Sequence, residues 1–207
     1  MSRGTFITFE GGEGSGKSTQ LERLADHLRG LGRPVEVTRE PGGTVGAEIV
    51  RRHLLDGRAK ALGEHAEAAL FAAARADHVA ARIAPALARG ATVLCDRFLD
   101  SSRAYQADDP LLPHLERAAI GRTMPDLTLI YDIDPEVGRD RVRRRDGSLD
   151  RFEASDAAEL ERRRAAFRRI ADAEPERCVV IDASGDAHTV HARTLAAVAE
   201  RLPVLLA

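Results

Sequence analysis

The sequence predicts an α/β fold in which helices cover a parallel sheet of five strands. Short apolar runs alternate with long helical stretches along the chain, and several of these runs are rich in β-branched residues. Strands that are apolar throughout and separated by helices are typical of a parallel sheet with right-handed crossovers. A length of 207 residues without repeats or linker-like stretches predicts a single domain.

The position of each element follows from this alternation. We expect strands at residues 5–9, 35–38, 92–95, 127–133 and 178–181. We expect helices at residues 17–29, 46–55, 64–89, within 101–122, and at 136–145, 155–173 and 188–201. Gly30, Gly57 and Gly90 follow helical stretches, where glycine commonly forms a left-handed C-terminal cap.

Charge and composition argue against several classes of protein. Lysine and arginine number 31 against 33 acidic residues, and a net charge of −2 disfavours a nucleic-acid partner or a polybasic membrane binder. No apolar run approaches the roughly 20 residues of a membrane-spanning helix, and residues 1–9 are too polar for a secretory signal. Cys95 and Cys178 lie in apolar runs, so we expect reduced core thiols in a cytoplasmic protein.

Residues 11–18 match the phosphate-binding pattern G-x-x-x-x-G-K-[ST], directly after an expected strand and at the start of a helix. Glycines let successive N–H groups point inward, and the helix N-terminus adds partial positive charge. We expect Lys17 to reach the β- and γ-phosphates of ATP and the Ser18 hydroxyl to ligate Mg²⁺. The alternative is a glycine-rich turn without a ligand. The expected ATP-binding residues are Gly11, Gly12, Glu13, Gly14, Ser15, Gly16, Lys17, Ser18 and Thr19.

Another expected strand ends in Asp96 and Arg97. A carboxylate at the carboxyl end of a neighbouring parallel strand is well placed to hold Mg²⁺, so Asp96 joins Ser18 as an expected metal-binding residue. The alternative is a surface ion pair between Asp96 and Arg97.

The remaining residues separate the classes of phosphate-loop protein. The chain has no asparagine, which a guanine-nucleotide switch needs in its base-reading motif, and it is small for a motor or helicase. This favours a small enzyme that passes a phosphoryl group to an acceptor. A monophosphate acceptor is mostly dianionic at pH 7, so its site needs cations rather than a general base. Arg51, Arg97 and the arginine-rich stretch 139–151 can supply them, although that stretch could instead be a solvated helical face.

Five segments carry a specific resemblance when they are taken together and in order. They are residues 9–20 (FEGGEGSGKSTQ), 38–44 (TREPGGT), 70–75 (LFAAAR), 96–106 (DRFLDSSRAYQ) and 149–153 (LDRFE). With them the chain resembles the bacterial thymidylate kinases over nearly its full length. The resemblance implies Mg²⁺-dependent transfer of the γ-phosphoryl group of ATP to dTMP, which gives dTDP for dTTP synthesis. It also implies a P-loop fold of the nucleoside-monophosphate kinase type and a homodimer.

The same resemblance implies an acceptor site. Phe71 resembles the ring that stacks on thymine, and Arg75, one helical turn on, resembles the donor to the thymine 4-carbonyl. Tyr105 resembles the residue that crowds the 2′ position of the sugar and so excludes ribonucleotides. Phe71 and Tyr105 could instead be packing aromatics. The implied dTMP-binding residues are Glu40, Arg51, Phe71, Arg75, Arg97, Ser102, Tyr105 and Gln106.

The family presents its catalytic arginine either from the phosphate loop or from a lid. Residues 13–15 contain no arginine here, whereas residues 139–145 contain five. This resembles the bacterial arrangement, with a lid at about residues 139–152. Ala183 matches the place where the adenine ring rests. The implied catalytic residues are Lys17, Asp96, Arg97, Arg143 and Arg145.

Three other functions stay open at this point. The nearest is a kinase for another nucleoside monophosphate, such as UMP or CMP. A second is an inactive phosphate-loop module, which the intact Lys17, Ser18 and Asp96 disfavour. A third is an RNA-binding protein that uses the arginine-rich stretch, which the net charge disfavours.

Overall fold

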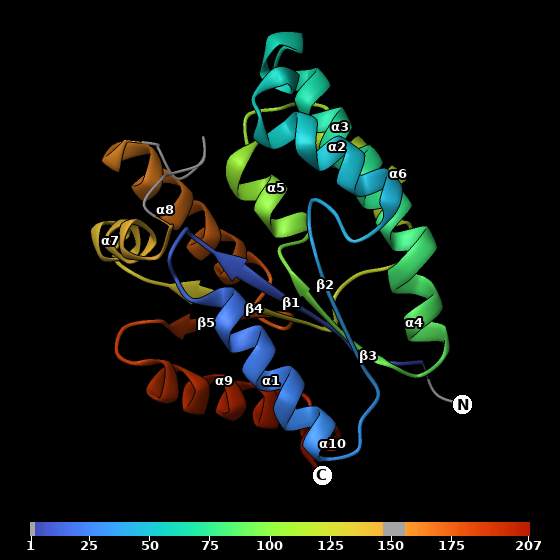
Figure 1. The fold of residues 1–207 in the computed structure, drawn as a ribbon, viewed down its shortest axis with the longest axis vertical. Coiled ribbons are helices and arrows are strands. Elements are labelled where there is room, and N and C mark those ends of the chain that lie inside the picture. Colours follow the sequence, from blue (N-terminus) through green and yellow to red (C-terminus); the bar gives the residue numbers. More distant parts are fainter. Residues whose placement is uncertain (1–2, 147–155) are drawn as a thin grey trace.

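The computed structural model describes residues 3–146 and 156–207, and it has the predicted α/β architecture. The five expected strands form one parallel sheet in the order β2-β3-β1-β4-β5 (Figure 1). Their ends lie within two residues of the predicted ones. The strands are β1 (Phe6–Gly11), β2 (Val35–Arg39), β3 (Thr92–Asp96), β4 (Leu127–Asp132) and β5 (Cys178–Asp182).

Helices cover both faces of the sheet, with α1, α9 and α10 on one face and α3 to α6 and α8 on the other (Figure 1). The long helices are α1 (Lys17–Gly30), α2 (Val45–Leu55), α3 (Glu64–His78), α6 (Leu112–Ile120), α7 (Pro135–Asp146), α8 (Ala157–Ala173) and α9 (Ala187–Arg201). The short ones are α4 (Ala84–Ala88), α5 (Leu99–Tyr105) and α10 (Pro203–Leu206).

The core lies in two main layers against a central strand. β1 is buried along its whole length, and Ile7 and Phe9 face α1 and α9 whereas Phe6 faces α4 and α5. A smaller cluster around Phe167 packs α8 against α5 and β4. Burial on both faces explains why apolar residues of β1 occur on both sides of the strand, at Phe6, Ile7 and Phe9.

The helix expected at residues 64–89 contains an irregularity. α3 gives way to a π-helical turn at Val79–Ile83 before α4 begins. Pro85 accounts for it, because proline has no N–H to donate and its ring clashes with the carbonyl one turn earlier. The Ala84 N–H reaches the Val79 carbonyl, five residues back, which is the π-helical pattern.

Two of the three predicted glycine caps are confirmed. Gly57 and Gly90 have φ angles of 81° and 80°. The prediction for Gly30 is wrong, because Gly30 is the last residue of α1 and Gly32 takes the left-handed conformation with φ of 75°. A hydrogen bond from the Arg33 N–H back into the last turn closes the helix in the Schellman pattern.

The carboxyl ends of the strands meet at one edge of the sheet. The strand register places Phe9 beside Asp96 and Gly11 beside Tyr131. The loop after β1 therefore lies between the ends of β3 and β4. Functional side chains of a parallel sheet gather at this edge, so the register positions the site.

The expected lid begins inside α7, which contains the predicted helix at 136–145. Val142 is buried and anchors this arginine-rich helix. Residues 147–152 of the expected lid lie outside the described residues.

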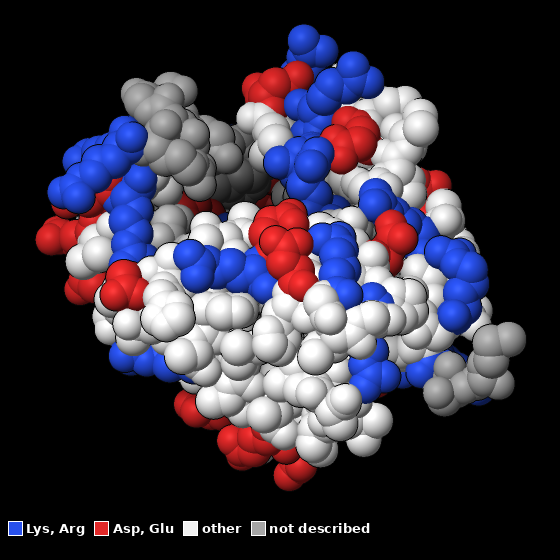
Figure 2. All heavy atoms as spheres, turned by 60° about the horizontal axis from the view of Figure 1, so that its bottom comes forward, with Lys and Arg blue, Asp and Glu red and all other residues white. Residues whose placement is uncertain are grey.

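The outer surface carries charges of both signs. In the view of Figure 2, basic and acidic side chains are scattered around a broad uncharged area, so this face has no dominant sign of charge. Within the described ranges, no helix is both long and apolar enough to span a membrane.

Candidate active site

The phosphate loop connects β1 to α1 and depends on glycine for its path. Gly11, Gly14 and Gly16 have φ angles of 129°, 69° and 89°, a region that residues with a side chain rarely adopt. The Lys17 ammonium lies over the loop and donates to the Gly12 carbonyl at 2.6 Å. Burial, reinforced by nearby Arg97, lowers the pKa of Lys17 to about 8.

Ser18 and Asp96 meet at the mouth of this loop. The hydroxyl of Ser18, in the first turn of α1, donates to a carboxylate oxygen of Asp96 at the end of β3, at 2.5 Å. A hydroxyl and one carboxylate are a suitable partial ligand set for Mg²⁺, which usually completes its shell with water and substrate phosphates. No cluster of three acidic, histidine or cysteine ligands occurs among the described residues.

Arg97 follows β3 in an unusual backbone conformation. Its φ of 68° is the one positive value found for a residue other than glycine in ranges 3–146 and 156–207. Such a conformation costs free energy and is common where a functional side chain must be aimed. The guanidinium donates to the Gly11 carbonyl at 3.2 Å and to a Glu13 carboxylate oxygen at 3.2 Å, so it lies against the phosphate loop.

Glu10 holds this turn in place, and sequence reasoning missed it. Its buried carboxylate accepts from the Phe98 N–H at 2.7 Å and from the Ser101 hydroxyl at 2.6 Å. Burial and then the charge of Asp100 raise the pKa of Glu10 to about 7. A glutamate inside an otherwise apolar strand was the available signal.

Glu13 joins the phosphate loop to the next cavity. The Tyr105 hydroxyl donates to the same Glu13 oxygen as Arg97, at 2.5 Å, and the other oxygen is buried with no hydrogen-bond partner among the described residues. Burial raises the pKa of Glu13, but Arg97 and Lys17 outweigh that effect and the net pKa is lowered. The Arg163 guanidinium lies 4.4 Å from the centre of the Tyr105 ring.

A cavity of about 330 Å³ opens beside the phosphate loop. This volume is within the range of small-molecule sites. Lys17, Ser18 and Asp96 line one end of it. The structure brings all eight implied acceptor residues to its wall: Glu40, Arg51, Phe71, Arg75, Arg97, Ser102, Tyr105 and Gln106.

Three hydrogen bonds hold the guanidinium of Arg75. Its Nε donates to Glu40 at 2.7 Å, and its Nη2 donates to the Phe98 carbonyl at 3.0 Å and the Ser102 hydroxyl at 3.1 Å. The side-chain oxygen of Gln106 is also buried, without a partner in the described part of the chain. The cavity therefore offers both fixed donors and uncommitted polar atoms.

The implied lid arginines are not gathered at this cavity. Arg143 is exposed on α7, 3.8 Å from Asp140, and the side chain of Arg145 lies outside the described residues. Arg141 donates to the carbonyls of Ala183 and Gly185 at 3.3 and 3.1 Å, so α7 contacts the loop after β5.

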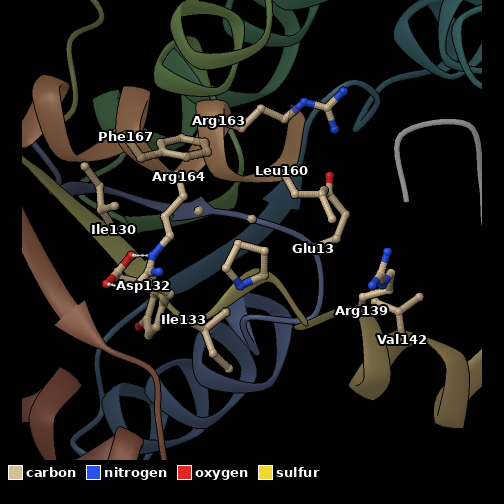
Figure 3. Close-up of a pocket in the computed structure, with 14 residues that line it drawn as sticks. Glu13, Ile130, Asp132, Ile133, Arg139, Val142, Leu160, Arg163, Arg164 and Phe167 are labelled. Atoms are coloured by element: carbon tan, nitrogen blue, oxygen red, sulfur yellow. Dashed lines mark hydrogen bonds and ion pairs between the residues drawn. The ribbon is translucent and has the colours of Figure 1, made fainter. Parts of the chain in front are cut away.

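A second, much smaller cavity of about 30 Å³ lies between the phosphate loop, α7 and α8 (Figure 3). Arg139 and Glu13 line it on one side, and Arg164 reaches across to Asp132 with hydrogen bonds of 2.7 and 3.1 Å. Beside it the two backbones touch, since a Cβ on Gly138 would be 2.5 Å from the Glu13 carbonyl oxygen. The start of α7 therefore rests directly on the phosphate loop.

The family model for thymidylate kinase matches residues 9–194. The chain belongs to the thymidylate kinase family. A thymidylate kinase of Nitrobacter hamburgensis is 54% identical over 211 residues, with 99% of this chain and 92% of the relative covered. A thymidylate kinase of Bradyrhizobium diazoefficiens is 51% identical, with 97% and 91% covered. The crystal structure of thymidylate kinase from Ehrlichia chaffeensis matches with a TM-score of 0.75 and 35% identity, over 95% of this chain and 98% of that one.

Membership of the thymidylate kinase family confirms the predicted fold type and the predicted enzyme class. A member of this family is a kinase that phosphorylates dTMP to dTDP, a step in dTTP synthesis. The roles of the individual site residues stay predictions.

Proposed function

We propose that dTMP binds in the cavity of about 330 Å³ and receives the γ-phosphoryl group of ATP held on the phosphate loop. One observation carries this proposal. The eight residues that the sequence resemblance assigns to dTMP, drawn from β2 through α5, line a single cavity that ends at Lys17, Ser18 and Asp96. Chance placement of eight residues from separate elements around one cavity is improbable.

Charge repulsion is the main obstacle to the reaction. Two unit charges 4 Å apart repel by about 4 kcal/mol at an effective dielectric of 20, and several such pairs form as the two phosphates approach. Lys17 and Arg97 supply positive charge where the loop meets the cavity. The dianionic acceptor needs no general base, so these residues act by binding and orienting the reacting groups.

Mg²⁺ would be held by the Ser18 hydroxyl and the Asp96 carboxylate. When bound, the ion neutralises charge on the ATP phosphates. The contribution of the chain is to hold the two oxygens together, one at the start of α1 and one at the end of β3. ATP as the donor is supported by the phosphate loop and by the family.

The lid proposal concerns Arg143 and Arg145. Both lie on the helix that begins on the phosphate loop, and we propose that movement of α7 relative to the loop brings one of them toward the transferred group. We place the adenine ring at Ala183. Ala183 itself has no exposed surface, so the ring would rest on the loop that follows it, whose path the Arg141 contacts hold.

We further propose a homodimer in the cytoplasm. Val45 and Ile49 leave 85% and 46% of their surfaces exposed on α2, and an apolar helix surface of this kind suits a second copy of the chain. Cys95 and Cys178 are buried free thiols, which suits a reducing compartment.

Steady-state release of ADP tests the function directly. With ATP and Mg²⁺, turnover should be highest with dTMP, lower with dUMP and far lower with UMP, CMP and GMP. A preference for a ribonucleotide would contradict the role given to Tyr105. Absence of turnover with every monophosphate would instead favour an inactive nucleotide-binding module.

A further inference from the structure

A buried histidine lies beneath the acceptor cavity. His78, the last residue of α3, has no exposed surface. Its Nδ1 is 3.0 Å from one carboxylate oxygen of Glu40, and its Nε2 is 2.7 Å from the Thr38 hydroxyl. The other Glu40 oxygen accepts from Arg75 Nε at 2.7 Å. Four side chains thus form one hydrogen-bonded chain from β2 to the cavity wall.

The chemistry of the partners orients the ring. A carboxylate only accepts hydrogen bonds, so Nδ1 of His78 carries a hydrogen and donates it to Glu40. The Thr38 hydroxyl can donate to Nε2 in return. Both nitrogens are therefore satisfied, and neither Glu40 oxygen is left unpaired. Buried networks in which each polar atom has a partner hold their members rigidly.

The segment 38–44 is shaped around this ring. A Cβ on Gly43 would be 2.5 Å from His78 Nε2 and 2.6 Å from the Thr38 hydroxyl oxygen, so only glycine leaves room for the pair. Gly43 also has a φ of 88°, and its carbonyl accepts from Arg82 Nη1 at 2.9 Å. Thr38, Glu40 and Gly43 of this motif thus share a structural purpose, which is to enclose His78.

The outcome of this chain is the placement of Arg75. Nε is held by Glu40, and Nη2 is occupied by Phe98 and Ser102. The third nitrogen of Arg75, Nη1, forms no hydrogen bond with another described residue. Arg75 lines the cavity. The direction in which Nη1 points depends on the position of Glu40, and the position of Glu40 depends on His78.

We propose that His78 is a positioning residue for recognition of the acceptor base: it fixes Glu40, which fixes the Arg75 donor that distinguishes a pyrimidine 4-carbonyl from a 4-amino group. This rests on the proposed function and on the assignment, implied by the resemblance, of Arg75 to position 4 of the base. Loss of the His78 contact leaves a buried carboxylate oxygen unpaired and loosens the contact of Glu40 to Nε. The guanidinium is then held only through Nη2 and can turn more easily. A donor that can turn away tolerates an amino group, so discrimination falls.

The test compares dUMP and dCMP, which differ at position 4 of the base (carbonyl against amino) and, as a consequence, at N3 (N–H against a lone pair); the Arg75→Ala variant isolates the part of the ratio that depends on Arg75. Inhibition constants against dTMP give the affinity of each without requiring its turnover. His78→Leu should raise KM for dTMP by about tenfold, leave kcat within about threefold and reduce the dUMP-to-dCMP affinity ratio by at least about fivefold. KM for ATP should stay unchanged, because the phosphate loop is not part of the chain of hydrogen bonds.

His78→Asn is the conservative control, because its amide can still donate to Glu40 from near the Nδ1 position. It should restore most of the lost ratio. Thr38→Val removes the hydroxyl at Nε2 and should shift the ratio in the same direction by less. This milder variant keeps the test valid if His78→Leu does not fold, which circular dichroism and Tm will show.

Arg75→Ala separates failure of this inference from failure of the proposed function. If Arg75→Ala leaves the dUMP-to-dCMP ratio unchanged, the assignment of Arg75 to the base is wrong. If Arg75→Ala abolishes the ratio but His78→Leu and Thr38→Val lower only stability or kcat, the positioning role of His78 is overturned. In the double variant His78→Leu/Arg75→Ala, the dUMP-to-dCMP affinity ratio should be the same as in Arg75→Ala alone, because His78 acts through Arg75. A further fall of the ratio would overturn the inference.

Discussion

The contact between the phosphate loop and α7 can be tested with one added methyl group. A Cβ on Gly138 would be 2.5 Å from the Glu13 carbonyl oxygen, and ordinary contacts begin near 3.4 Å. The loop and the helix must therefore separate by about 0.9 Å in Gly138→Ala. Both partners at this point are backbone, so no side-chain rotation can relieve the crowding.

Two effects on stability oppose each other in this variant. Alanine in a helix is favoured over glycine by about 1 kcal/mol, whereas crowding of this kind costs about 1–3 kcal/mol. We expect the free energy of unfolding of Gly138→Ala to fall by at most about 2 kcal/mol. A displacement near 1 Å at a reaction centre costs on the order of 10²-fold in rate. We therefore expect kcat to fall by about that factor, much more than stability suggests.

Gly30→Ala is the matched control. Gly30 is also a helical glycine, at the last position of α1, and a Cβ there would meet nothing within 4 Å. For Gly30→Ala we expect an unchanged kcat. We expect the free energy of unfolding to rise by up to about 1 kcal/mol, which corresponds to a Tm higher by about 2–4 °C. Coupled ADP release gives kcat, and calorimetry gives Tm. Native kcat in Gly138→Ala would refute the idea that this contact sets the geometry of loop and lid.

Three further predictions address other parts of the site. Lys17→Ala should lower kcat by about 10²–10³-fold, because a cation at the transferred phosphate is lost. Calorimetric titration should find the affinity for dTMP largely unchanged. An equal loss of kcat and of dTMP affinity would place Lys17 in the acceptor site. The pKa of Glu10 is raised from 4.5 to about 7 in the folded protein, so its stabilising contribution is complete below about pH 4.5 and is lost as the pH rises through 7. Between pH 5 and 8 the Glu10 carboxyl should lower the free energy of unfolding of the wild type by about 3 kcal/mol, and Glu10→Gln should lack this decrease. Urea denaturation of both proteins at the two pH values measures it, and an equal change in both proteins would contradict the prediction. Arg177→Met should lower the free energy of unfolding, measured by urea denaturation, by at most about 3–5 kcal/mol. Fully buried Asp100 loses its two contacts to Arg177, at 2.7 and 3.0 Å, and keeps the longer contact to Arg103 at 3.3 Å. Adding Asp100→Leu should recover much of the loss, and no recovery would mean that the pair is not coupled.

The predictions from sequence were confirmed where they depend on a pattern that extends over only a few residues. The five strands are short apolar runs flanked by helical stretches, and the phosphate loop combines glycines, Lys17 and a strand-to-helix change within a few residues. The positions that failed depend on details of geometry. Gly32 rather than Gly30 caps α1, and the turn at Val79–Ile83 is π-helical because Pro85 displaces the hydrogen-bond pattern.

The acceptor residues show a different limit. The resemblance selected the eight residues, but only the fold could place them around one cavity. It could not indicate that Arg75 is held by Glu40, nor that His78 holds Glu40, since His78 and Glu40 are 38 positions apart. A histidine at the end of an amphipathic helix gives no local signal of the partner it will meet.

By itself the sequence determined the strands, the helices and the phosphate loop of this protein, because hydrophobic period and glycine spacing act over a few residues. Only the tertiary structure decided which polar groups meet. The contacts of Glu10 with Phe98, of His78 with Glu40 and of Gly138 with Glu13 each join segments distant in the chain. Their energies come from hydrogen bonds and contacts that exist once the sheet brings those segments within a few ångströms.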